Sequence, residues 1–222
     1  ARSMDLCVAL AKRAGVLVGA HPGPWSRDDR GRGEVRLDPA ALELLLAQQV
    51  GALQAIAAAR GVVLSHVKLH GSLYHSVDAD PALARRYLAT MRRLWPGVAV
   101  IARAGGRVHR LGARSGVRVL GEAFADRAYR TDGTLVPRRE PGAVLHDPED
   151  VVARVRRLVR DGRIASAGGG GDVAVRAQAL CVHGDTPGAP ALVRAVGAAL
   201  RSGDRTGSGT RSAGSRPRRS RR

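Results

Sequence analysis

Short β-branched runs alternate along this chain with amphipathic segments, and this alternation limits the folds that the chain can adopt. Four of the amphipathic segments begin with a capping residue followed by proline: Asp38-Pro39, Asp80-Pro81, Asp147-Pro148 and Thr186-Pro187. Asp and Thr side chains satisfy free N–H groups at helix N-termini, and proline is favoured at the first helical position. Apolar residues recur behind each pair at helical spacing, so each pair predicts the start of a helix.

Five runs rich in Val, Leu and Ile lie between the predicted helices. They cover residues 16–20, 62–67, 98–102, 117–120 and 180–182. Strands that alternate with helices pair in parallel, because each helix returns the chain to the same end of the sheet. The pattern predicts an α/β fold whose sheet is either open and doubly wound or closed into a barrel. Both arrangements bind ligands at the carboxyl ends of their strands.

The composition excludes several classes of protein. Hydrophobic residues make up 44% of the 222 residues and aromatic residues only 3%, so we expect a core of Leu, Val, Ile and Ala. The two cysteines, Cys7 and Cys181, form neither a disulfide framework nor a CxxC zinc motif. No apolar run reaches the roughly 18 residues of a transmembrane helix. The N-terminal residues do not resemble a signal peptide, so a cytoplasmic location is expected.

The net charge of +18 is distributed unevenly along the chain. Residues 201–222 hold eight arginines and one aspartate, a net of +7, which leaves +11 on the preceding residues. This final segment is rich in Gly, Ser and Arg without apolar periodicity, so we expect a globular domain over 1–201 and a disordered tail over 202–222. The other arginines are scattered over polar helix faces without interleaved aromatic residues, so neither a specific nucleic-acid partner nor a membrane is expected.

Ionisable residues follow four of the five predicted strands. In chain order they are His21, then Lys68 and His70, then Glu122, Asp126 and Arg127, and finally His183 and Asp185. A single histidine of this kind is more often structural than functional. Four strand ends that meet at one edge of a sheet are harder to assign to chance, so the pattern predicts a shared site at that edge.

Strand parity refines this prediction for the second strand. Side chains alternate between the two faces of a strand, so Lys68 and His70 share one face. The apolar residues Val67 and Leu69 share the other. His66 lies lower on the same strand, and we expect it to be structural.

Four longer motifs carry a family resemblance. They are GAHPG at 19–23, HVKLHGSLYH at 66–75, EAFADRAYRTDGTLVPR at 122–138 and CVHGDTPGA at 181–189. In this order and at this spacing they resemble the LamB/YcsF family over residues 4–200. The resemblance implies an irregular seven-stranded (β/α) barrel of the glycoside hydrolase/deacetylase type. Family members begin with two strands that have no counterpart here, so we expect a barrel that lacks its first two strands.

The same resemblance implies a reaction and partners. Proteins of this family serve as the A subunit of an ATP-dependent 5-oxoprolinase, which opens the lactam ring of 5-oxoproline to give L-glutamate. ATP, accompanied by Mg²⁺, would be the co-substrate, and subunits B and C would be the protein partners. Phosphorylation of the lactam oxygen would make the ring carbon electrophilic.

The charged residues at the strand ends suit this chemistry. Lys68 and Arg127 would stabilise phosphate or oxyanion charge. Asp126 or Asp185 would bind Mg²⁺ or orient a base. The metal ligands themselves stay open.

Further residues complete the expected site. The histidines that would move protons are His21, His70 and His183. The expected substrate- or ATP-binding residues are Glu122, Arg127, Tyr129 and Arg138. The run from Gly168 to Gly171 lacks the Lys-Ser/Thr of a phosphate-binding loop and opens no predicted helix, so it indicates a hairpin or loop.

Several positions depart from the family pattern. In residues 24–35, Ser26, Asp29 and Arg30 stand where the family has Asp, Gly and Phe. Other differences are Leu69, Ser72, His75 and the pair Gln178-Ala179. These departures leave two alternatives open. In the first, the chain is a paralogue or fragment of the family that is catalytically impaired or acts as a scaffold. In the second, it is a metal-dependent deacetylase-like hydrolase.

Overall fold

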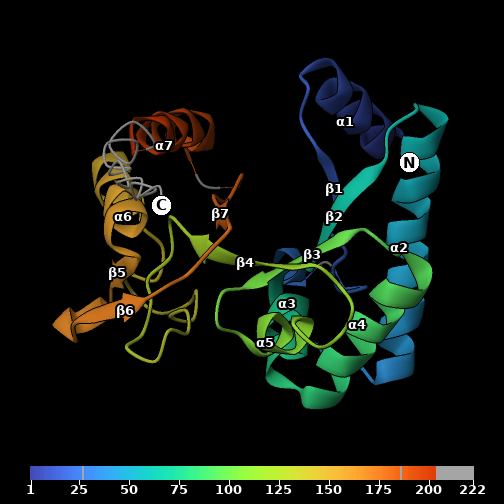
Figure 1. Cartoon of the computed structure of the whole chain (residues 1–222), viewed down its shortest axis with the longest axis horizontal. Helices are drawn as coiled ribbons and strands as arrows, with labels where there is room; N and C mark the ends of the chain where they lie inside the picture. The colour runs from blue at the N-terminus through green and yellow to red at the C-terminus, as the bar shows by residue number, and fades with distance from the viewer. Residues whose placement is uncertain (27, 186, 204–222) are drawn as a thin grey trace, which may run out of the picture. The chain divides into compact units, whose positions relative to one another are not determined.

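The computed structural model describes residues 1–26, 28–185 and 187–203 (Figure 1). These residues divide into two compact units. Unit 1 comprises Ala1–Ala123 and Arg176–Leu180, and unit 2 comprises Phe124–Val175 and the residues from Cys181 onward. The predicted tail lies outside the described residues from position 204.

Unit 1 is built on a parallel sheet with helices between its strands. Its elements are α1 (Arg2–Arg13), β1 (Val18–Ala20), the 3₁₀ turn η1 (Asp28–Gly31), α2 (Pro39–Ala59), β2 (Leu64–Lys68), α3 (Gly71–Ala79), α4 (Pro81–Leu94), β3 (Ala99–Arg103), α5 (Arg107–Gly112) and β4 (Val119–Phe124), whose last residue begins unit 2. The strands β1 to β4 pair in parallel in sequence order. The sheet is completed by β7 (Ala179–Cys181), in the order β1-β2-β3-β4-β7.

The predicted α/β class and all five predicted strands are confirmed. A barrel that lacks its first two strands is expected to have five strands, and the largest sheet in the described residues has five and stays open between β1 and β7. A seven-stranded barrel is not confirmed. The two remaining strands, β5 (Arg163–Ala165) and β6 (Asp172–Ala174), pair antiparallel and only with each other.

Unit 2 holds this hairpin together with two helices, α6 (Pro148–Asp161) and α7 (Ala189–Gly203). The helices α6 and α7 pack against each other, and β5 packs against α6. The glycine run lies between β5 and β6 and includes the short 3₁₀ turn η2 (Ala167–Gly169). The run therefore forms a hairpin connection, as its sequence indicated, and does not open a helix.

Three of the four predicted helix starts are confirmed by their caps. The side chains of Asp38, Asp80 and Asp147 each accept backbone N–H bonds from the first turn of the helix that follows, and proline occupies the first turn each time. The fourth prediction was wrong in detail, because α7 begins at Ala189 rather than at Pro187. Thr186 lies outside the described residues.

The helices α3 and α5 were not predicted. Neither begins with a side-chain cap: His70 and Gly106 hold the capping positions without a side-chain hydrogen bond. Gly71 enters α3 with a φ of 54°, a left-handed conformation that glycine adopts without steric cost. Both helices therefore lack the local signals on which sequence reasoning depends.

The helix α2 is the core helix of unit 1. By length and composition alone its 21 residues pass as a membrane span, although the sequence reading found no such run. Its residues Leu42, Leu45, Leu46 and Val50 are fully buried. Glu43, on another face, forms ion pairs with Arg86 and Arg93 of α4. One buried face and one ion-paired face are typical of a core helix in a globular unit.

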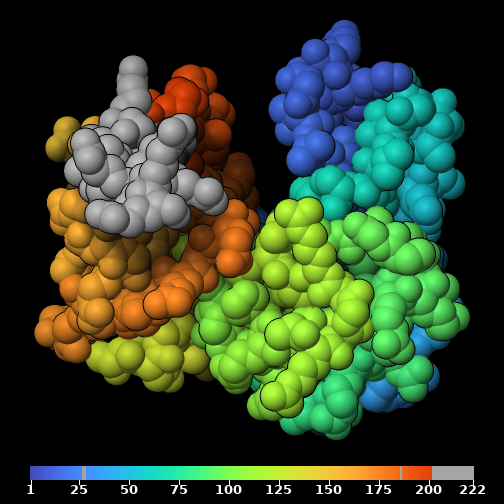
Figure 2. Space-filling view, viewed as in Figure 1, coloured from blue at the N-terminus to red at the C-terminus, as the bar shows by residue number. Residues whose placement is uncertain are grey.

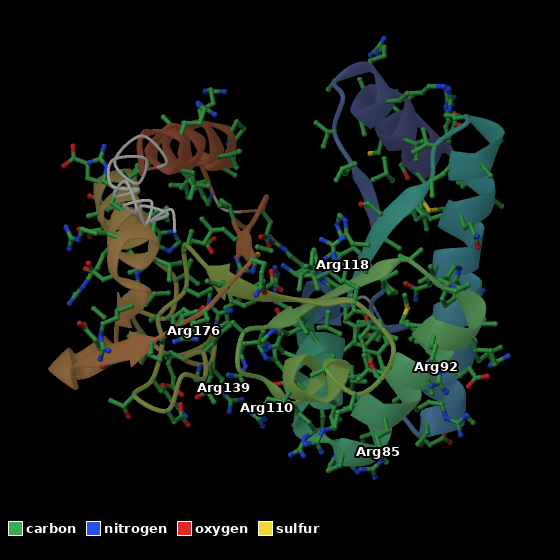
Figure 3. All side chains as sticks on the ribbon, viewed as in Figure 1. Arg85, Arg92, Arg110, Arg118, Arg139 and Arg176 are labelled. Atoms are coloured by element: carbon green, nitrogen blue, oxygen red, sulfur yellow. The ribbon has the colours of Figure 1, made fainter. Side chains whose placement is uncertain are left out.

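The surface is basic in a dispersed way. Figure 3 labels six exposed arginines, which come from α4, from α5 and from connecting segments of both units: Arg85, Arg92, Arg110, Arg118, Arg139 and Arg176. These arginines therefore follow the scattered pattern predicted from the sequence. The surface of unit 1 also includes α1, dark blue in Figure 2, on which Leu6 and Leu10 are exposed.

Replacing Leu46 by alanine tests the assignment of α2 to the core. Because the Leu46 side chain is fully buried, Leu46→Ala leaves a cavity and should lower the free energy of unfolding by about 2–5 kcal/mol. The matched control is Leu44→Ala on the same helix, where the side chain is 66% exposed, and the expected change is below about 0.5 kcal/mol. Urea unfolding followed by circular dichroism measures both, and equal losses would contradict the assignment.

Candidate functional site

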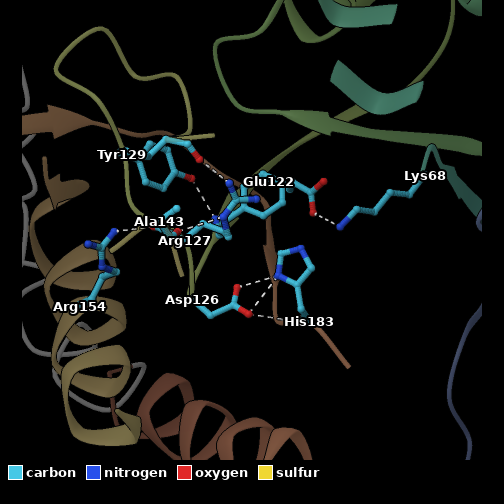
Figure 4. A network of polar contacts seen from close by, with 10 residues as sticks. Lys68, Glu122, Asp126, Arg127, Tyr129, Ala143, Arg154 and His183 are labelled. Atoms are coloured by element: carbon cyan, nitrogen blue, oxygen red, sulfur yellow. Dashed lines mark hydrogen bonds and ion pairs between the residues drawn. The ribbon is translucent and has the colours of Figure 1, made fainter. Parts of the chain in front are cut away.

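Lys68, the last residue of β2, forms an ion pair with Glu122 of β4 (Figure 4). Lys68 Nζ lies 2.7 Å from Glu122 Oε2, and the Glu122 side chain is only 2% exposed. The neighbouring Val67 and Leu69 are buried, as strand parity predicted. The other carboxylate oxygen of Glu122, Oε1, is buried and has no hydrogen-bond partner among the described residues. A buried acceptor of this kind is unusual and marks this pair as a candidate for ligand binding.

His21 and His70 meet at the ends of β1 and β2. His21 Nδ1 is 2.7 Å from the carbonyl oxygen of Lys68, and His21 Nε2 is 3.0 Å from His70 Nδ1. The Nε2 atom of His70 lies 2.8 Å from the carbonyl oxygen of Arg30 in η1. The structure therefore brings together the four candidates of unit 1, two as an ion pair and two as a histidine pair.

The strand β2 ends at Lys68, and His70 is the residue that precedes α3. The backbone is still extended at His70, with φ −96° and ψ 143°. Val67 and Leu69 are buried whereas Lys68 and His70 are less so, as the alternation of side chains predicts. The turn at Gly71 then begins α3.

The expectation that His66 is structural agrees with its surroundings. His66 Nδ1 lies 2.7 Å from Ser65 Oγ, and the ring packs over Gly19 of β1, where a Cβ atom would come within 2.2 Å of His66 Nε2. Burial lowers the pKa of His66, and the charge of Lys68 acts in the same direction. His66 is therefore a neutral ring that fills the space left by a glycine.

In unit 2, Asp126 and His183 form a buried carboxylate–imidazole pair (Figure 4). The oxygens Oδ1 and Oδ2 of Asp126 lie 2.9 Å and 3.0 Å from His183 Nδ1, and the backbone N–H of His183 donates to Oδ2. The side chain of Asp126 is 0% exposed and that of His183 is 20% exposed. Phe124 stacks on the imidazole at a centroid distance of 6.0 Å.

The protonation of this pair follows from its contacts. Burial by itself raises the pKa of Asp126, but the hydrogen bond and the charge of His183 outweigh burial, so the pKa lies below its usual value of 3.8. An ionised carboxylate only accepts hydrogen bonds, so Nδ1 of His183 carries a proton. In the neutral ring the Nε2 atom is then the proton acceptor, which is the arrangement of an oriented general base.

Arg127 holds a loop of unit 2 in place. Its guanidinium donates to the carbonyl oxygens of Val136 (2.6 Å) and Ala143 (3.1 Å), and its own carbonyl accepts a bond from Arg154 of α6. Arg127 is only 4% exposed. These contacts support a positioning role, in which the guanidinium binds backbone carbonyls of the segment 127–143 (Figure 4).

The remaining candidates have diverse surroundings. Tyr129 is buried, and its hydroxyl accepts a hydrogen bond from the backbone N–H of Phe124. One guanidinium nitrogen of Arg138, Nη2, is buried and has no hydrogen-bond partner within the described part of the chain. Asp185 lies exposed in the segment after β7.

Sequence reasoning missed two residues that position these loops. Gln49 of α2 receives a hydrogen bond from Gly23 N and donates one to Gly23 O, which fixes the segment after His21. Arg154 of α6 donates to the carbonyl of Arg127. Both are polar residues within amphipathic helices, and no local pattern distinguishes them from ordinary solvent-facing residues.

No group of three or more His, Cys, Asp or Glu side chains lies close enough to hold a metal ion among the residues that the structure describes. Asp126, one of the two aspartates expected to bind Mg²⁺, directs both carboxylate oxygens at His183. The described donor set therefore does not fit a protein-held Mg²⁺ site.

An open parallel sheet with ionisable side chains at its strand ends has the architecture of an α/β enzyme. The chain belongs to the LamB/YcsF family, whose family model matches residues 1–213. This confirms the resemblance that the four motifs carry.

Individual relatives agree with this assignment. The 5-oxoprolinase A subunit from Paracidovorax citrulli is 45% identical over 192 residues, covering 86% of this chain and 75% of the relative. The protein of the same name from Syntrophobacter fumaroxidans is 44% identical over 197 residues, covering 89% and 78%. The crystal structure of the lactam utilization protein from Thermus thermophilus matches with a TM-score of 0.83 and 39% identity, covering 90% of this chain and 80% of that chain.

Replacing Asp126 by asparagine tests the buried pair in unit 2. Because the folded pKa is depressed, the stabilisation by ionised Asp126 is complete above the unfolded pKa of about 3.9 and is lost as the pH falls through the lower folded pKa. At pH 7, Asp126→Asn should lower the free energy of unfolding by about 1–3 kcal/mol. The difference from the wild type should shrink once the pH falls below about 4.

Urea unfolding at a series of pH values measures this difference. The control is Glu34→Gln, which removes the same charge from an exposed pair with Arg36 and should change the free energy by less than about 0.5 kcal/mol. An Asp126→Asn difference that is constant down to acid pH would contradict the assignment of an ionised Asp126.

Proposed function

We propose that this chain acts as the A subunit of an ATP-dependent 5-oxoprolinase, which opens the lactam ring of 5-oxoproline to L-glutamate together with subunits B and C. The names of the relatives and of the structural match support the class of substrate. The relatives are named as subunits, which supports an assembly of several chains.

The observation that carries the catalytic part of the proposal is the Asp126–His183 pair. Opening a lactam requires a water molecule that loses a proton as its oxygen bonds to the ring carbonyl carbon. The ring C–N bond then breaks, and the nitrogen takes a proton to become the amine of glutamate. His183, with Nδ1 bonded to the carboxylate of Asp126 at 2.9 Å, presents Nε2 as the base that accepts the proton of water.

Lys68 and Glu122 form a separate candidate binding site within unit 1. An ammonium group binds anionic oxygens such as those of a carboxylate or a phosphate. Lys68 Nζ is held by Glu122 Oε2 at 2.7 Å, so its position is set before a ligand binds. The buried Glu122 Oε1, which has no hydrogen-bond partner among the described residues, would accept an N–H group of such a ligand.

ATP hydrolysis is proposed to drive the reaction, because an unactivated lactam is a poor electrophile. The glycine run of unit 2 connects two strands and does not precede a helix, so the described residues do not include a phosphate-binding loop of that type. No residue of this chain is therefore assigned to ATP.

A second candidate function is that of a scaffold protein without catalytic activity. It is favoured by η1, where the family's Gly and Phe are replaced by Asp29 and Arg30. These two residues have φ values of 47° and 54°, a left-handed conformation that glycine tolerates best. The backbone of this segment is therefore strained at the positions where the chain departs from its family.

The assay that tests the proposal is ATP-dependent release of glutamate from 5-oxoproline by the full chain reconstituted with subunits B and C. His183→Gln should lower kcat by about 10²–10³-fold, since it removes the proposed general base. Lys68→Met should also lower the activity, since it removes the charge proposed to bind an anionic group in unit 1. Arg85→Ala, an exposed position on α4, is the control and should leave kcat unchanged.

Loss of folding is distinguished from loss of chemistry by a double variant. Lys68→Met alone leaves the buried Glu122 carboxylate unpaired, which costs about 3–5 kcal/mol. Lys68→Met combined with Glu122→Gln removes both charges, so it should recover stability without recovering activity. Full activity in His183→Gln would reject the catalytic proposal. A wild-type chain that assembles with its partners but releases no glutamate would support the scaffold.

A further inference from the structure

Three contacts in a row connect the ends of β1 and β2, neighbours in the sheet (Figure 1), to the turn η1. The Lys68 carbonyl oxygen is 2.7 Å from His21 Nδ1. His21 Nε2 is 3.0 Å from His70 Nδ1, and His70 Nε2 is 2.8 Å from the Arg30 carbonyl oxygen. The two imidazole rings lie at 80° to each other with centroids 4.8 Å apart.

The two outer contacts determine where protons must be. A carbonyl oxygen only accepts hydrogen bonds, so His21 Nδ1 and His70 Nε2 both carry protons. If both rings were neutral, the two inner nitrogens would each present a lone pair to the other at 3.0 Å. A hydrogen bond at that distance requires one proton between them.

We propose that His21 and His70 form a single proton-binding site, in which one proton is shared between His21 Nε2 and His70 Nδ1. The pair then carries one positive charge in total. This inference concerns the two rings alone and does not rest on the proposed reaction.

The ring orientations are determined by the same contacts. Imidazole orientation is assigned from hydrogen bonds, and here each ring uses both of its nitrogens. Turning either ring by 180° about its Cβ–Cγ bond would place carbon atoms at both contact positions and lose both bonds. The observed orientation is therefore the one that satisfies all three contacts.

The space around His70 is shaped by glycine. A Cβ atom at Gly31 would lie 3.0 Å from His70 Cδ2, and one at Gly23 would lie 3.3 Å from His70 Cβ. The backbone N–H of His70 also donates to the carbonyl oxygen of Pro22 at 2.8 Å. The His70 ring is therefore approached closely on two sides, while its contact with His21 is exposed.

Charged and titratable residues occur on the elements that adjoin the pair. β2 carries Lys68, whose ammonium pairs with Glu122 of β4, and His66, a ring that burial keeps neutral. The other such residues on the adjoining elements are Asp29, Arg30 and Arg32 in and after η1 and His75 on α3. A carboxylate stabilises the shared proton and the cations oppose it.

The shared proton has a structural consequence. It links the segment after β1 to the segment after β2 and, through Arg30, to η1. Loss of the proton leaves two lone pairs facing each other, which weakens the link between the two strand ends. His70 Nε2 keeps its own proton and its contact with the Arg30 carbonyl oxygen.

Nitrogen NMR of the full native chain, labelled with ring-¹⁵N histidine, tests the proposal directly. His146, exposed in unit 2, is the internal reference, and spectra are compared at a pH at which His146 shows one protonated and one bare nitrogen. At that pH the outer nitrogens of His21 and His70 should appear protonated. The two inner nitrogens should resonate about midway between the protonated and bare positions, as expected for a proton shared between coupled sites.

Variants assign the signals and provide the controls. In His70→Gln the remaining His21 should revert to one protonated and one bare nitrogen, and His21→Gln should do the same to His70. His75→Gln, an exposed position on α3, should leave the signals of the pair unchanged. Two fully bare inner nitrogens in the native chain would overturn the proposal, and so would an intermediate signal that persists after the partner is removed. If a variant does not fold, the native spectrum decides by itself.

Discussion

Parallel pairing of β1 to β4 is the constraint on which the rest of unit 1 depends. Parallel pairing brings the carboxyl ends of these strands to one edge of the sheet. After each strand the chain leaves the sheet at that edge. Ionisable residues at such ends pair with each other, because an unpaired charge in a buried position is costly. Lys68 and Glu122 accordingly form an ion pair across β3, while His21 and His70 meet at the ends of β1 and β2.

The histidines of this chain show how one side chain acquires different roles from its contacts. His66 is half-buried against Gly19 and stays neutral. His183 is oriented by the carboxylate of Asp126, which leaves Nε2 as a base. His70 is oriented by a carbonyl oxygen of η1 and by His21. In each case the partner of one ring nitrogen determines the chemistry of the other.

Much of this arrangement follows from local sequence. Capping by Asp38, Asp80 and Asp147 acts within one helical turn, so the three helix starts were correctly predicted. Where local signals are weak, prediction failed: α3 has no side-chain cap, and this helix was not predicted. Among the candidate site residues, Lys68 and Glu122 were found from their strand ends, whereas Gln49 carried no signal in the sequence.

The sequence by itself determined the α/β class, the five strands of the sheet and the residue types at their ends, because hydrophobic periodicity and helix capping are short-range properties. It also determined membership of the LamB/YcsF family through motifs of up to seventeen residues such as the one at 122–138. Only the tertiary structure decided which ionisable groups pair. The bond between Asp126 and His183 spans 57 positions, and that between His21 and His70 spans 49. Contacts over such separations depend on strand order and register, which no local pattern specifies.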